Sequence, residues 1–102
     1  MTPAEAALQI ANTVRMEFGY KPADRLKRGV PCEGTDCPIA MTIHGDGEFE
    51  HEVFVDTTYI RVGAEVWTFD DPEYGPRYFP LPQDAELFVT RFDAGAYAEY
   101  LD

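Results

Sequence analysis

The most regular hydrophobic pattern of the chain lies near its N-terminal end. Apolar residues recur there at helical spacing on one face: Ala7, Ile10, Ala11, Val14 and Phe18. Before them, Thr2 can cap a helix, Pro3 suits the first helical position and Glu5 completes a capping box. Gly19 follows as a typical C-terminal stop signal. The pattern predicts a helix over residues 3–18.

A second, shorter helix is indicated further along. Residues 19–37 show no regular period and are predicted to form a loop, with room for a basic helical turn at 24–28. Asp36-Cys37-Pro38 then has the form of a helix start, because proline is tolerated in the first turn. Gly45 and Gly47 predict that this helix is short.

The middle of the chain changes to a period of two. Residues 49–55 alternate between apolar and polar side chains, residues 56–58 form a turn signal, and residues 59–62 return as a second strand. Gly63-Ala64 is a further turn signal, and residues 65–69 complete a third strand. We therefore expect a three-stranded antiparallel meander.

The C-terminal part returns to helical spacing. Residues 70–80 contain three prolines and three aromatic rings and are predicted to form an irregular loop. Leu81-Pro82 opens the last helix, Gly95 ends it, and a helical turn over 97–101 follows. Its apolar stripe comprises Ala85, Phe88, Val89 and Phe92. Together these elements predict an α+β fold in a single domain, residues 1–102, with helices and sheet packed as two layers.

Composition and charge limit the function classes. The chain has 102 residues, of which 45% are hydrophobic and 14% aromatic, which excludes a disordered chain. Its net charge of −11 argues against direct nucleic-acid binding. Residues 1–28 carry a net +2, whereas residues 29–102 carry −13. No apolar run approaches the ~20 residues that span a bilayer, and Met1 leads directly into a helix signal, so we expect a cytoplasmic protein without membrane contact.

Two short motifs point to a biological setting. The segments Cys37-Pro38-Ile39-Ala40 and Phe88-Val89-Thr90-Arg91-Phe92-Asp93-Ala94-Gly95 resemble small uncharacterised proteins encoded by phages of actinobacteria. The resemblance covers residues 29–95 loosely and differs in the additional Cys32 and the acidic first strand. It implies the cytoplasm of an infected bacterial host as the setting, and no activity comes with it.

The metal-ligating residue types are concentrated in one segment. Cys32, Cys37, His44 and His51 are the residue types of a tetrahedral zinc site. Their C-x4-C-x6-H-x6-H spacing matches no common zinc finger, and the alternative is that Cys37 packs as a small hydrophobic residue. The chain contains no phosphate-binding glycine loop, no G-x-S-x-G and no H-E-x-x-H. We therefore expect neither a cofactor nor enzymatic activity, with zinc binding as an alternative.

An aromatic loop is the first candidate partner-binding surface. Tyr74, Arg77 and Tyr78 lie between prolines, which stiffen a loop and lower the entropy lost on binding. Tyrosine and arginine are enriched at interface hot spots. The alternative is that the rings of this loop fold over the sheet and complete the core. Of the two neighbouring rings, we expect Tyr78 to be exposed and Phe79 to be buried.

An acidic row is the second candidate surface. In an extended strand Glu48, Glu50 and Glu52 share one face. Asp46 and Asp56 extend that row, while Phe49, His51, Val53 and Val55 turn to the core. Such a ridge suits a basic groove on a partner. The alternative is a solvent-exposed face of the sheet, partly neutralised by Arg61.

The leading hypothesis is thus a small acidic, phage-encoded accessory protein that binds and modulates a host protein, or another phage protein, with a basic surface. The first alternative is a nucleic-acid mimic that inhibits a DNA-binding host or defence protein. The second is a small zinc-binding protein. The opposite charges of residues 1–28 and 29–102 are also compatible with a homodimer.

Overall fold

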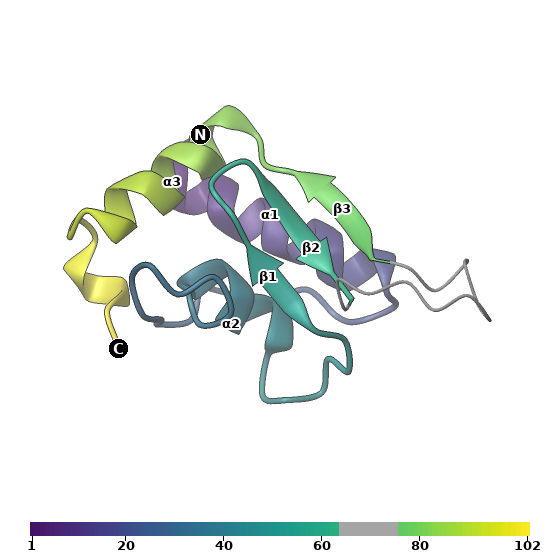
Figure 1. Ribbon diagram of the computed structural model, residues 1–102. Helices are drawn as coiled ribbons and strands as arrows, with labels where there is room; N and C mark the ends of the chain where they lie inside the picture. Colours follow the sequence, from purple (N-terminus) through teal and green to yellow (C-terminus); the bar gives the residue numbers. More distant parts are fainter. Residues whose placement is uncertain (64–75) are drawn as a thin grey trace.

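The computed structural model describes residues 1–63 and 76–102 of the chain. Its elements are α1 (Pro3–Glu17), α2 (Pro38–His44), β1 (Val53–Val55), β2 (Tyr59–Val62), β3 (Arg77–Pro80), α3 (Gln83–Asp93) and a 3-10 turn (Ala98–Tyr100) (Figure 1). The helices and the three-stranded antiparallel sheet confirm the predicted α+β class. Within the described ranges, no helix is long and apolar enough to cross a bilayer.

Helix α1 forms as its local signals predict. The Glu5 amide donates to the Thr2 hydroxyl at 3.1 Å, and the Thr2 amide donates to the Glu5 carboxylate at 3.2 Å, so the capping box is complete. The predicted apolar stripe is buried apart from Phe18, which is half-buried at the end of the helix. Gly19 follows with a φ of +85°, a left-handed conformation that favours glycine.

The other predicted helices are also confirmed. Helix α2 starts at Pro38 behind the extended Cys37, and it stops at Gly45, whose φ is +64°. All four residues of the predicted stripe of α3 are buried. The predicted turn near the C-terminus is the 3-10 turn at Ala98–Tyr100.

The sheet contains a strand where the sequence predicted a loop. Strand order is β1-β2-β3, with antiparallel pairing throughout. The prediction of a loop over residues 70–80 is wrong for 77–80, which form β3 as an edge strand, a position that tolerates a terminal proline. The predicted strand at 65–69 lies outside the described residues.

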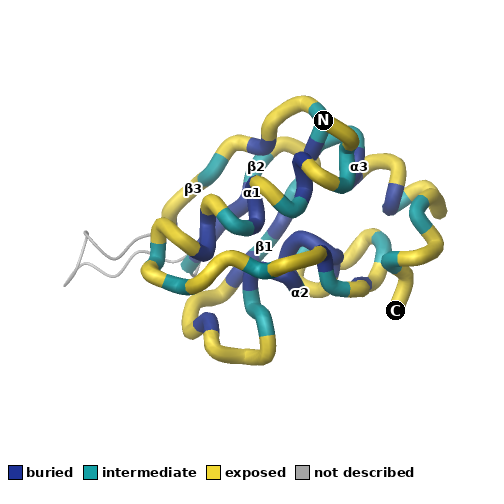
Figure 2. The backbone as a smooth tube through the Cα atoms, turned by 180° about the vertical axis from the view of Figure 1, so that it is seen from behind, coloured by how far each residue is buried: buried dark blue, intermediate teal, exposed yellow. Residues whose placement is uncertain are grey.

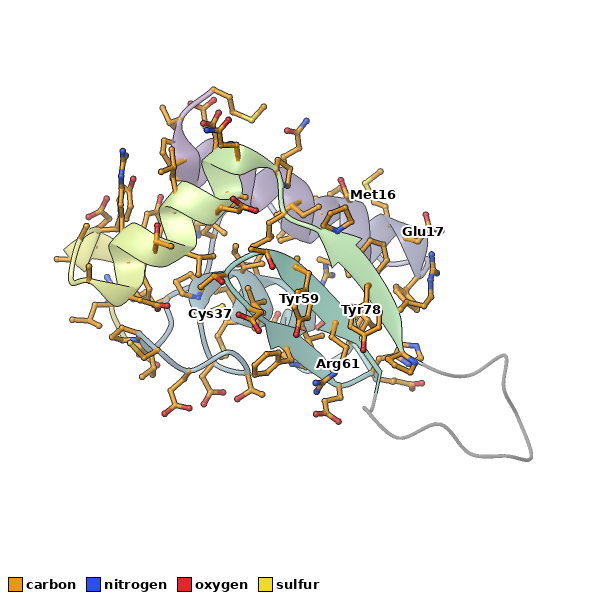
Figure 3. All side chains as sticks on the ribbon, turned by 45° about the horizontal axis from the view of Figure 1, so that its top comes forward. Met16, Glu17, Cys37, Tyr59, Arg61 and Tyr78 are labelled. Carbon is orange, nitrogen blue, oxygen red and sulfur yellow. The ribbon has the colours of Figure 1, made fainter. Side chains whose placement is uncertain are left out.

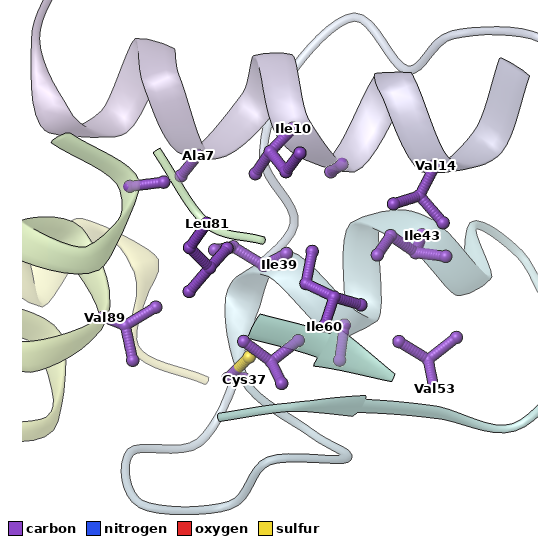
Figure 4. Close-up of a cluster of buried hydrophobic side chains, with 14 of the residues drawn as sticks. Ala7, Ile10, Val14, Cys37, Ile39, Ile43, Val53, Ile60, Leu81 and Val89 are labelled. Carbon is purple, nitrogen blue, oxygen red and sulfur yellow. The ribbon is translucent and has the colours of Figure 1, made fainter. Parts of the chain in front are cut away.

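The helices cover one face of this sheet (Figure 1). Side chains from α1, α2, the strands and α3 meet in one buried cluster, and Figure 4 shows Ile10 and Val14 of α1 facing Ile43 and Ile60. Seen from the helix side, the buried stretches gather at the centre of the molecule and the exposed ones surround them (Figure 2). On the opposite face, no helix is present among residues 1–63 and 76–102.

One loop runs along β1 and completes its outer edge. The Val55 amide donates to the Gly34 carbonyl at 2.9 Å. A Cβ atom at Gly34 would lie 2.6 Å from the Phe54 ring, so only glycine permits this close approach. The loop therefore packs closely against Phe54 at the edge of the sheet.

Candidate partner-binding face

Alternate residues of the three strands form a face that points away from the helices. We call this set the open face: Phe54, Tyr59, Arg61, Tyr78 and Pro80. Its members alternate with residues such as Ile60 and Val62, which are buried in the core. Phe54, Arg61 and Tyr78 are direct cross-strand neighbours and make one row across all three strands. Figure 3 shows Tyr59, Arg61 and Tyr78 side by side on the sheet.

The two tyrosines of the open face hold each other. Their ring centroids are 5.5 Å apart in an edge-to-face arrangement, which suits the ring quadrupoles. Tyr78 remains 56% exposed, whereas Tyr59 is half-buried. Partial desolvation and the nearby Asp56 carboxylate raise the pKa of Tyr59, so its hydroxyl stays protonated. The pair offers a partner two ordered rings and their hydroxyl groups.

Arg61 occupies the centre of this face and is held from several sides. Its guanidinium donates to Glu52 at 3.0 Å and to the Gly63 carbonyl at 3.2 Å, and it lies 5.0 Å from the Phe54 ring centroid. Arg61 is 7% exposed. The pair with Glu52 confirms that Arg61 neutralises part of the acidic stretch.

The acidic stretch does not form the predicted straight row. Strand β1 begins at Val53, so the strand prediction is wrong for residues 49–52, and His51 is exposed instead of facing the core. The paired register of β1 and β2 ends at Val53 and Val62, and one further backbone hydrogen bond follows, from the Gly63 amide to the Glu52 carbonyl at 2.8 Å. Before Glu52 the rings pack at the end of α1 instead, because Phe49 and His51 both lie against the Phe18 ring.

Glu48 does not belong to an acidic row either, because it pairs with Arg15, a residue that the sequence did not indicate as part of the site. Arg15 is 5% exposed and donates to Glu48 at 2.8 Å and to the carbonyls of Lys21 and Ile43 at 2.7 Å each. The Arg15 hydrogen bond is the main cause that lowers the pKa of Glu48 to about 2. Glu48 therefore anchors the loop after α2, while Glu50 stays exposed.

The aromatic-loop candidates divide between two faces. Tyr78 is exposed as predicted, and Phe79 is half-buried against the core. Arg77 points to the other side of β3, where it pairs with Glu17 at 3.1 Å and lies 5.1 Å from the Phe18 ring centroid. It links β3 to the end of α1 and is not part of the open face. Tyr74 lies outside the described residues.

Comparison of the chain with protein-family models, curated proteins and solved structures finds no match. What the site can do therefore follows from its own side chains. Ordered tyrosines beside an arginine favour contact with another protein. The period-two alternation of the strands could have revealed Tyr59 and Phe54 as members, but a tyrosine or phenylalanine in a strand is as common inside a core as on a surface.

The cysteines and histidines do not assemble into a metal site. Across residues 1–63 and 76–102, no three histidine, cysteine or acidic side chains lie together in a way that could hold a metal ion. Cys32 is exposed, and its amide donates to Asp93 at 2.8 Å, whereas Cys37 is buried at the start of α2. Burial raises the pKa of the Cys37 thiol to about 11, so the thiol is neutral at pH 7 and a poor nucleophile. His44 and His51 both contact the Phe49 ring.

Proposed function

We propose that this protein is a small acidic accessory protein whose open face binds a partner protein. The observation that carries the proposal is the Tyr59–Tyr78 ring pair beside Arg61, on the sheet face that points away from the described helices. Tyrosine and arginine are enriched among the few residues that supply most of the binding energy at protein interfaces. Here they are already ordered by contacts within the sheet, so binding loses little side-chain entropy.

The charge of the chain defines the kind of partner. With a net charge of −11 and with Glu52 and Asp56 beside the open face, the protein attracts basic surfaces. Such attraction acts mainly on the association rate and weakens as salt is added. The resemblance to actinobacterial phage proteins supports a host protein as the partner, and we propose modulation of that protein as the biological role.

The nucleic-acid mimic is less well supported. A mimic needs repeated, accessible negative charges, whereas Glu48 and Glu52 are engaged by Arg15 and Arg61. Asp46 is likewise paired with Lys27 at 2.7 Å. These ion pairs divide the acidic stretch into separate, partly neutralised groups, which favours the aromatic face as the binding surface.

The proposal is tested by comparing three tagged forms of the full chain as bait in a lysate of an actinobacterium. These are the wild type, a Tyr59→Ala/Tyr78→Ala variant and a Met16→Ala control. Met16 is 59% exposed on α1, away from the open face, so its substitution removes exposed apolar surface elsewhere (Figure 3). Thermal melts establish that each form is folded.

We expect the wild type and the control to retain the same protein and the double variant to lose it. With that protein purified, loss of two hot-spot rings should weaken binding by about 2 kcal/mol or more, roughly thirtyfold. Equal retention by the folded double variant, or no specific retention by the wild type, would contradict the proposal. Sedimentation of the protein alone separates self-association from partner binding.

A further inference from the structure

A pocket of about 370 Å³ lies next to the open face, between the loop at 32–35, the end of β1 and the end of α3. We call it the acidic pocket. Its walls include Cys32, Glu33, Phe54, Asp56, Val89 and Asp93. Phe54 belongs to both the pocket and the open face, so a partner on that face reaches the pocket directly.

The walls of the pocket carry charge of a single sign. Three carboxylates, those of Glu33, Asp56 and Asp93, line it, and no lysine or arginine is among its lining residues. The Cys37 thiol also lines the pocket, but burial keeps it protonated, so it contributes no charge. Where Glu48 and Glu52 each have an arginine, the pocket carboxylates have no ion-pair partner within the described ranges.

The position of two of these carboxylates is fixed by the backbone. Asp93 accepts the Cys32 amide at 2.8 Å, and Asp56 accepts the Thr57 amide at 2.7 Å. Asp56 also accepts the Thr57 hydroxyl at 3.4 Å and lies close to the Tyr59 hydroxyl. Both carboxylates keep capacity for a further donor, since an ionised carboxylate accepts several hydrogen bonds. Phe54 and Val89 add apolar surface between them.

From this geometry we infer that the acidic pocket receives a basic side chain of the partner protein that docks on the open face. The aliphatic stem of a lysine or arginine fits the apolar wall, and its charged end reaches the carboxylates. The inference rests on the proposed function and adds the chemistry of the partner. The partner would carry a basic residue next to the part of its surface that covers Tyr59 and Tyr78.

The test needs no identified partner. N-acetyl-arginine amide is titrated into the ¹⁵N-labelled full chain at low salt, with N-acetyl-citrulline amide as an uncharged probe of the same shape. We expect saturable shifts of amide signals in the 32–35 loop and at Thr57 with the arginine probe, and no saturable shifts with citrulline. Equal responses to both probes, or shifts scattered over the whole surface, would overturn the inference.

Charge-removing variants locate the site. Asp56→Asn and Asp93→Asn keep an oxygen that can accept the amide bonds, and each should weaken arginine binding about two- to fivefold, the range for exposed ion pairs. The control is Asp24→Asn/Glu99→Gln, which changes the net charge by the same amount as the combined Asp56→Asn/Asp93→Asn variant. Both control positions are exposed and lie outside the pocket, so the control should bind the arginine probe as the wild type does.

If neither pocket substitution changes the binding of the arginine probe, the proposed site is refuted. If a variant does not fold, the comparison of the arginine and citrulline probes on the wild type still tests the site. The two proposals fail separately. If the arginine probe does not bind in the pocket, Tyr59→Ala/Tyr78→Ala should still abolish partner capture. If that double variant still captures the partner, the open face is rejected as the binding surface, whatever the result with the probes.

Discussion

Arg15→Met is the substitution that tests most directly how this fold is held together. Arg15 lies on the buried side of α1, and its guanidinium joins three separate parts of the chain: the carbonyl of Lys21, the carbonyl of Ile43 at the end of α2, and the carboxylate of Glu48. Methionine keeps an unbranched apolar stem in the same space but donates no hydrogen bond. The variant therefore removes the polar contacts with little change in packing.

The size of the loss follows from the two carbonyl contacts. Each is a 2.7 Å hydrogen bond from a charged donor, worth about 1.5–3 kcal/mol. Without Arg15 both carbonyls lose a partner, so we expect a loss of about 3–5 kcal/mol. For a domain whose stability is about 5–15 kcal/mol, that is a large fraction. Glu48 adds little to this sum, because its side chain is 44% exposed and water can replace the guanidinium.

Urea titration followed by circular dichroism measures the effect, with Glu48→Gln as the comparison. Arg15→Met should lower the midpoint strongly, and Glu48→Gln should lower it only slightly. A loss below about 1 kcal/mol for Arg15→Met would show that the buried guanidinium does not hold these segments. Equal losses for the two variants would show that the ion pair, and not the carbonyl contacts, is what matters.

Three further predictions concern acid, the core and metal. The pKa of Glu48 is lowered from 4.5 to about 2, so its contribution to stability is present above pH 4.5 and is lost as the pH falls toward 2. Glu48→Gln should remove this part of the pH dependence of the free energy of unfolding. An acid unfolding profile identical to that of the wild type would contradict the prediction. Phe92→Ala should cost about 3–5 kcal/mol in a denaturant titration, since Phe92 is buried and stacked on Phe88, whereas a cost below about 1 kcal/mol would place it outside the core. Protein purified without added zinc should contain none by metal analysis, and chelation should leave its Tm unchanged; one bound equivalent would restore Cys32, Cys37, His44 and His51 as ligand candidates.

The features that were predictable from the sequence are those encoded locally. The Thr2–Glu5 capping box and the stripe of α3 depend on residues a few positions apart, and both are present in the structure. Strand β3 was hidden because Arg77–Pro80 is flanked by prolines, and whether such a segment pairs depends on β2, which precedes it by many residues.

Arg15 shows the limit from another side. A basic residue in the last turn of a helix is usually explained by the helix dipole, and its charge argues for a surface position. Its real partners are backbone carbonyls at Lys21 and Ile43, and every residue type has such a carbonyl. The pattern of side chains in the sequence therefore cannot predict the contact of Arg15 with these carbonyls. The open face was only partly visible for a similar reason, since its Phe54–Arg61–Tyr78 row exists only once the register is fixed.

The two edges of the sheet bear on how a partner can attach. A partner that adds a strand to a sheet needs a row of unpaired backbone donors and acceptors. Beside β1, the Gly34 carbonyl already takes the Val55 amide. At the other edge, β3 is bordered by Pro76 and ends in Pro80, neither of which has an amide hydrogen to donate. Strand addition is thus disfavoured on both sides. The proposed binding by this sheet would therefore depend on side chains, so that single substitutions could change the choice of partner.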